Sequence, residues 1–110
     1  MNPLGWTGGI CQTATHGVIC SAKAKAGRAN VFRESLKELL LPTLADEGCL
    51  RYEMNESEGG ESWILTELWE RRALWNRRME SPQLDRYRTM VKDLAEYWNL
   101  FLGHIVRSGS

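Results

Sequence analysis

The chain of 110 residues lacks an excess of charge of either sign. Lys and Arg together number 14, and Asp and Glu together also number 14, so the formal net charge is zero. Nucleic-acid-binding domains and proteins that lie on anionic membranes ordinarily carry a basic surplus. We therefore expect neither a nucleic acid nor a membrane among its partners. A net charge near zero also favours association between copies of a protein.

Long apolar runs are absent as well, since none approaches the ~20 residues that span a membrane. No Lys or Arg occurs before Lys23 and no apolar segment follows it, so we expect no secretory signal. Cysteine is scarce: Cys11, Cys20 and Cys49 are odd in number and far apart. This pattern predicts reduced thiols and a cytoplasmic location, and its spacing suits no zinc site, so we expect no metal.

The first fifteen residues lack any hydrophobic period. They are rich in Gly and Thr, with Trp6 as the one large aromatic side chain. We predict a flexible N-terminal arm over residues 1–15, one domain over 16–107 and a loose tail over 108–110. A domain of this length can bury one modest core.

Strand and helix periods alternate along the rest of the chain. Alternation of apolar and polar residues predicts strands, and apolar residues three and four apart predict helices. The strands are expected at 16–25, 49–55, 62–69 and 100–107, and the helices at 28–44, from 70 to about 80, and 82–97. The order β-α-β-β-α-α-β predicts an α+β fold, with the helices on one face of an antiparallel sheet.

Such a fold leaves one face of the sheet without a helix. The strand pattern places Ile19, Ile64, Thr66 and Leu68 on that face. Because an apolar face of this kind is ordinarily covered, we expect a homodimer that pairs through its sheet faces.

The change from strand to helix occurs next to Trp69, within a stretch rich in Trp and Arg. This position puts a large aromatic at the edge of any space between the sheet and the helices. Trp75 and Met79 follow four residues apart, on one side of the next helix. A ligand cavity is expected here.

Several segments together resemble the antibiotic biosynthesis monooxygenase (ABM) domain family. These are Gly27 before a helix that contains Phe32, Leu41-Pro42-Thr43, the run EGCLRYE at 47–53, ELWE at 67–70 and MESP at 79–82. The resemblance covers about residues 16–106. It implies a ferredoxin-like domain whose sheets pair into a dimeric α+β barrel, with a cavity between sheet and helices.

The family resemblance also implies a range of activities. Members include cofactor-independent monooxygenases that act on quinols and aromatic polyketides, and haem-degrading enzymes. A His usually stands nine residues after the strand Trp, and often another follows the Ser-Pro pair; here these positions hold Arg78 and Gln83. Haem-degrading members use an Asn where this chain has Cys20, so only Trp69 matches them. Because Arg cannot replace a neutral imidazole as a ligand, we expect no haem. The monooxygenase chemistry that the resemblance implies needs no metal or flavin, so we expect no other cofactor.

Two charged residues are the catalytic candidates. Glu67 shares a strand face with Trp63 and Trp69, where a half-buried carboxylate with a raised pKa could serve as a base on a phenol. Its alternative role is an internal ion pair or a hydrogen bond to a helix end. Arg78 could hold a phenolate or stabilise developing negative charge. Its alternative is a surface position, paired with Glu70 or Glu80.

The other candidates are uncharged and would bind the substrate: Trp69, Trp75, Tyr87, Tyr52 and Cys20. Aromatic walls stack on planar ligands and tyrosine hydroxyls hydrogen-bond to them, but plain core packing is the alternative for each. The sequence thus favours a cofactor-independent monooxygenase acting on a small, electron-rich aromatic. The alternative is a non-catalytic dimeric protein that binds a small ligand or serves in assembly.

Overall fold

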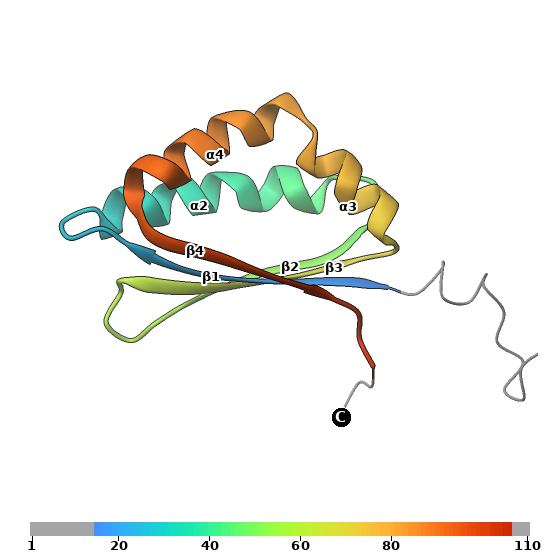
Figure 1. Ribbon diagram of the computed structural model, residues 1–110, viewed down its shortest axis with the longest axis horizontal. Coiled ribbons are helices and arrows are strands. Elements are labelled where there is room, and N and C mark those ends of the chain that lie inside the picture. The colour runs from blue at the N-terminus through green and yellow to red at the C-terminus, as the bar shows by residue number, and fades with distance from the viewer. Residues whose placement is uncertain (1–14, 107–110) are drawn as a thin grey trace, which may run out of the picture.

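The computed structural model describes residues 15–106, so the predicted arm, apart from residue 15, and the predicted tail lie outside the described residues. The elements follow the predicted order (Figure 1). They are β1 (His16–Ala24), α2 (Ala29–Leu44), β2 (Cys49–Glu56), β3 (Ser62–Trp69), α3 (Arg72–Met79), α4 (Pro82–Leu94) and β4 (Ala95–Gly103). No helix within residues 15–106 is long and apolar enough to cross a membrane.

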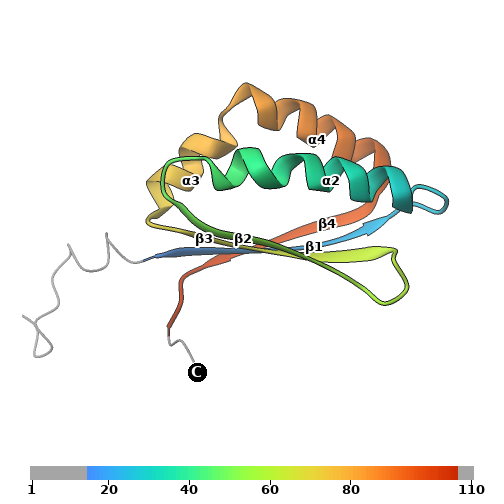
Figure 2. The same cartoon turned by 180° about the vertical axis from the view of Figure 1, so that it is seen from behind.

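The four strands form one antiparallel sheet in the order β2-β3-β1-β4. All three helices cover the same face of this sheet, and the opposite face is bare (Figures 1 and 2). The predicted α+β, ferredoxin-like architecture is therefore confirmed. The first strand lies inside the sheet, whereas β2 and β4 form its edges.

The core lies between the sheet and α2. The inward face of β1 is small and buried, with Cys20 and Ala22 in the interior. Directly beside them on β3 stand Leu65 and Trp63, as the period of two predicts. The apolar stripe of α2 packs on this floor, and its buried members are Phe32, Leu36, Leu39 and Thr43. Burial of this stripe, at ~25 cal/mol per Å² of apolar surface, holds α2 on the sheet.

The start of β2 departs from the predicted alternation. Strict alternation over the strand predicted at 49–55 would place Leu50 on the same face as Tyr52 and Met54, but the Leu50 side chain is exposed. The register of β2 on β3 shifts between Cys49 and Arg51. A bulge of this kind inserts one residue into one strand, which turns Leu50 outward while Cys49 packs against the core.

The end of the third helix was also predicted wrongly. The apolar steps extend to Trp98, but α4 ends at Leu94 and β4 runs over Ala95–Gly103 instead of 100–107. Trp98 fits both periods. Pairing of this segment with β1 supplies a ladder of backbone hydrogen bonds, and it still buries Trp98 against Phe32 and Tyr87. The sheet contact therefore decides the structure of this segment.

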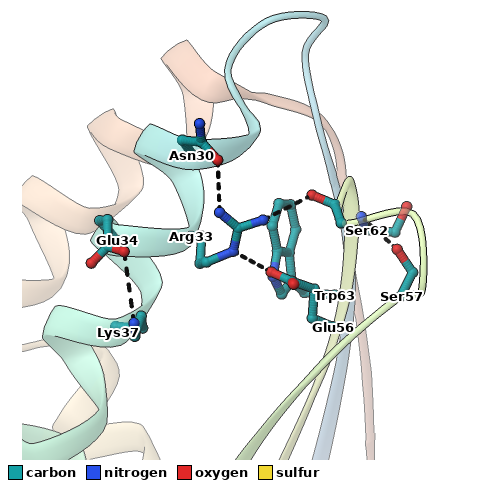
Figure 3. Close-up of polar contacts among 9 residues, drawn as sticks. Asn30, Arg33, Glu34, Lys37, Glu56, Ser57, Ser62 and Trp63 are labelled. Carbon is teal, nitrogen blue, oxygen red and sulfur yellow. Dashed lines mark hydrogen bonds and ion pairs between the residues drawn. The ribbon is translucent and has the colours of Figure 1, made fainter.

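A polar cluster ties the start of α2 to the β2–β3 hairpin (Figure 3). Arg33 pairs with Glu56 and donates to the carbonyl oxygen of Gly60 at 3.3 Å. The indole Nε1 of Trp63 donates to the same Glu56 carboxylate at 2.9 Å. The hydrogen bond from Arg33, together with that from Trp63, lowers the pKa of Glu56 below its usual range. This cluster fixes the end of the domain that lies away from α3.

Candidate functional site

A partly open cavity of about 330 Å³ lies between the helices and the sheet. This volume falls within the range of small-molecule sites. The walls are mostly apolar and come from all three helices and all four strands. The lining residues are Val18, Thr43, Tyr52, Glu67, Trp75, Arg78, Met79, Leu84, Tyr87, Arg88, Val91, Lys92, Trp98 and Leu100.

Five of the seven residues proposed from the sequence line this cavity. Tyr52 comes from β2, Glu67 from β3, Trp75 and Arg78 from α3, and Tyr87 from α4. Tyr52 and Glu67 lie on the strand face that is turned toward the helices, because side chains alternate along a strand. The helices α3 and α4 cover that same face of the sheet (Figure 1), so their side chains reach the same space. The fold thus brings together residues that are far apart in the sequence.

Trp69 and Cys20 lie next to the site but do not line the cavity. Both are fully buried, Trp69 among Val18, Leu74 and Trp75, and Cys20 in the core beneath α2. Burial, with a smaller contribution from the charge of Glu67, raises the pKa of the Cys20 thiol to about 12. The structure therefore places both residues in core packing, behind the cavity wall.

Among residues 15–106, Glu67 is the one carboxylate that lines the cavity. It lies on the inner strand β3, paired with Val18 on β1 and with Tyr52 on β2. The indole Nε1 of Trp69 donates a hydrogen bond to its Oε1 at 3.0 Å. Burial raises the pKa of Glu67, and this effect exceeds the opposing influence of the Trp69 hydrogen bond and the Arg78 charge. A carboxylate in these surroundings is a stronger base than an exposed one.

Arg78 is buried, with 8% of its surface exposed, so its predicted alternative as a surface residue paired with Glu70 or Glu80 is wrong. Its Nη2 donates to Thr43 Oγ1 at 2.9 Å, and its Nη1 donates to Gln83 Oε1 at 2.9 Å. Its Nε lies 3.0 Å from Oδ2 of Asp46 as an ion pair. One guanidinium thus joins α3 to the end of α2, to the following turn and to the start of α4.

Two tyrosine hydroxyls belong to the same region. Burial raises the pKa of Tyr52 and of Tyr87 well above the ordinary range, so both stay protonated at neutral pH. The Tyr87 Oη is buried and has no hydrogen-bond partner within residues 15–106. Since an unsatisfied buried hydroxyl is costly, it is ready to hydrogen-bond to an oxygen atom of a bound ligand.

The sequence did not point to several residues of the cavity wall. Thr43 lies on the inner side of α2, and Trp98 follows the helix predicted over residues 82–97. Arg88 and Lys92 were not among the candidates. Their spacing of four places them on one side of that helix, and this is the only signal by which they could have been found.

The family model described as "Antibiotic biosynthesis monooxygenase" matches residues 15–90.

The chain belongs to this family.

A Mycobacterium tuberculosis protein named "Putative monooxygenase Rv0793" is 28% identical over 83 residues, which are 76% of this chain and 82% of the relative. The solved structure of Rv0793 matches with a TM-score of 0.81 at 23% identity, over 88% of this chain and 100% of that one. PA3566 from Pseudomonas aeruginosa matches with a TM-score of 0.80 at 18% identity, over 87% and 98% of the two chains. These structural matches show the shared fold.

The chain departs from the ABM pattern at two positions that touch each other. Arg78 and Gln83 stand where the resemblance places histidines, and here their side chains are hydrogen-bonded at 2.9 Å. The imidazoles are thus replaced by a polar contact between α3 and α4. Glu67 remains in the cavity wall as a carboxylate whose pKa is raised by burial, which makes it a stronger base than an exposed carboxylate.

Proposed function

We propose that this protein is a monooxygenase that uses molecular oxygen to oxidise an electron-rich aromatic, such as a quinol or a polyketide-type phenol, without a metal or organic cofactor. The observation that carries this proposal is Glu67: a carboxylate with a raised pKa, set in an apolar cavity between aromatic walls. Membership of the ABM family supports the reaction class.

The proposed reaction starts with proton removal. The reactive ring carbon carries two hydrogens in the keto tautomer of the substrate, and Glu67 accepts one of them as a proton. The resulting carbanion forms a bond to oxygen, and the proton returns from Glu67 to give a hydroperoxide. Loss of the second hydrogen as a proton breaks the O–O bond, leaving a carbonyl group and water. One CH₂ group and one O₂ thus give one C=O group and one H₂O, and no other reductant is needed.

The other residues have supporting roles in this proposal. The hydrogen bond from Trp69 holds the Glu67 carboxylate in position. The rings of Trp75 and Trp98 offer flat apolar walls for an aromatic substrate. The hydroxyl groups of Tyr52 and Tyr87 can donate to the substrate oxygen as negative charge develops on it.

Oxygen consumption with a panel of hydroquinones and anthrones tests the proposal. We expect a rate above that of buffer, and we expect Glu67→Gln to lower kcat by about 10²-fold or more, as for loss of a general base. Glu53→Gln is the matched control, because Glu53 is an exposed carboxylate elsewhere on the sheet. A rate equal to that of buffer, or equal rates for wild type and Glu67→Gln, would contradict the proposal.

One observation favours a second candidate, a non-catalytic protein that binds small aromatic ligands. Arg78 is engaged by Thr43, Asp46 and Gln83, so it serves the packing of the helices and is less available to a reacting oxygen atom. Under this candidate, hydroquinones bind to the cavity with no oxygen uptake. Calorimetry of binding alongside the oxygen electrode separates the two functions.

We also propose that the protein acts as a homodimer formed through the bare sheet face. Ile19 and Phe101 are cross-strand neighbours on that face and are 44% and 65% exposed. Ile64 lies on the same face and is 43% exposed.

We further propose a cytoplasmic location. Cys20 and Cys49 are free thiols, which agrees with a reducing compartment.

A further inference from the structure

Three cationic side chains line the cavity, and they differ in their surroundings. Arg78 pairs with Asp46, and Arg88 pairs with Asp85 at 2.8 Å; neither carboxylate lines the cavity. No ion pair joins Lys92 to a carboxylate of residues 15–106. Lys92 is therefore the cation of the cavity wall whose charge is not already neutralised by a neighbouring carboxylate.

The position of Lys92 marks the opening of the cavity. Arg88, Lys92 and Leu100 are exposed although they line it, so the cavity opens along α4 and the edge strand β4. Lys92 lies in the last turn of α4, which leads directly into β4. The charged ammonium group thus stands at the mouth, where a ligand can reach it while its ring lies inside.

Lys92 and Glu67 stand toward opposite ends of the cavity. In the sheet register Glu67 is level with Val18. The chain passes from Lys92 through the end of α4 into β4, where Trp98 is level with Ala22, four residues further along β1. At ~3.3 Å per strand residue these levels are roughly 13 Å apart. In Figure 1, α4 runs from the α3 end of the sheet to the opposite end, where β4 begins. Glu67 thus lies toward one end of the cavity, within the influence of the Arg78 charge, and Lys92, which has no ion pair among residues 15–106, lies toward the other.

We propose that the cavity selects aromatic acids, and that Lys92 binds the carboxylate of the ligand while its hydroxyl end lies against Glu67. This rests on the cavity being the ligand site of the proposed function, and it adds the substrate class. A ligand that carries its hydroxyl and carboxyl groups at opposite ends of a fused ring matches both polar groups. The apolar walls between them accommodate the ring.

The expected size of the effect follows from the exposure of Lys92 to solvent. An exposed ion pair contributes at most about 1 kcal/mol, which is about fivefold in affinity. The competing explanation is that Lys92 only complements the negative end of the α4 dipole. In that case a carboxylate on the ligand does not raise its affinity for the cavity. The two explanations therefore predict different affinities for ligands with and without a carboxylate.

Calorimetric titration with a matched ligand pair tests the proposal. The probes are the hydroxynaphthoic acid with its hydroxyl and carboxyl groups on opposite rings, and the naphthol that lacks the carboxyl group. We expect wild type to bind the acid about fivefold more tightly than the naphthol at low salt. Lys92→Met is expected to remove this preference without changing the naphthol affinity, and Lys92→Glu to reverse it. Raised salt should weaken binding of the acid alone.

Lys37→Met is the matched control, because Lys37 is an exposed lysine of α2 that does not line the cavity. It should retain the preference for the acid. Equal affinities of wild type for acid and naphthol would overturn the proposal, as would an equal loss for both ligands in Lys92→Met. Calorimetry measures ligand affinity without any reaction. A lack of oxygen uptake would therefore refute the proposed reaction but would not affect the test of the ligand preference.

Discussion

At the scale of single residues, the protonation of Glu67 depends on its surroundings. It is uncharged below its pKa, and burial raises that pKa above the model-peptide value of 4.5. The folded state therefore holds the Glu67 proton more tightly than the unfolded chain does. The stability contributed by the neutral form is fully present below pH 4.5 and is lost as the pH rises through the raised pKa.

This linkage gives a prediction for Glu67→Gln. The amide keeps an oxygen acceptor for Trp69 but has no charge to bury. Near pH 4 we expect a fixed difference between the free energies of unfolding of the variant and of wild type. As the pH rises towards neutrality, wild type should lose stability relative to the variant, because only wild type must bury a charge. Urea unfolding at a series of pH values measures this difference. A difference in unfolding free energy that does not vary with pH would show that burial does not raise the pKa of Glu67.

Seven candidate site residues were chosen from the sequence, and five of them line the cavity. Strand alternation was sufficient for Tyr52 and Glu67, because it fixes which face a side chain occupies. Trp69 obeys the same rule, yet α3 covers it, and no local pattern reveals how closely a later helix packs. Lys92 was missed because its role depends on where α4 ends relative to β4.

At the scale of elements, Arg78 is the contact that holds three segments together. The ion pair with Asp46 has one buried member, and the two hydrogen bonds reach α2 and α4. Its sequence neighbour Arg77 pairs with Glu47 in an exposed position. The two adjacent arginines thus make similar ion pairs in very different surroundings.

Replacing each arginine by methionine should separate these surroundings. Arg78→Met leaves Asp46 and Thr43 without their partner, and we expect a loss of about 2 to 3 kcal/mol in the free energy of unfolding, below the full range for buried pairs because Asp46 is partly exposed. Arg77→Met should cost less than about 0.5 kcal/mol. Thermal and denaturant unfolding measure both. Equal losses would show that burial of Arg78 does not matter.

The elements themselves were largely predictable, and the two errors have a common cause. The bulge at Cys49–Arg51 and the early end of α4 are both determined by pairing with a neighbouring strand. Local periodicity does not contain that information. Trp98 shows this clearly, since it satisfies both a helical and a strand pattern and only the presence of β1 decides between them.

At the scale of the whole molecule, the proposed homodimer depends on the bare sheet face. Phe101→Lys and Ile19→Lys place charge in the middle of the proposed contact. We expect either change to convert a dimer to a monomer, measured by light scattering coupled to size-exclusion chromatography. Leu41→Lys is the control: Leu41 is 74% exposed on α2, on the helical side, and its change should leave the mass unchanged. A wild-type protein that elutes as a monomer would contradict the dimer.

The central position of β1 has a consequence for how the chain reaches this structure. Gly17, near the start of the described chain, pairs with Gly103, near its end. Because β1 precedes β4 in the chain, the second edge of β1 stays unpaired until β4 has been synthesised. Contacts so distant in sequence slow folding, because a long loop must close before they form. We expect β4 to dock late, so that a nascent chain still lacking β4 exposes one side of β1 to other chains.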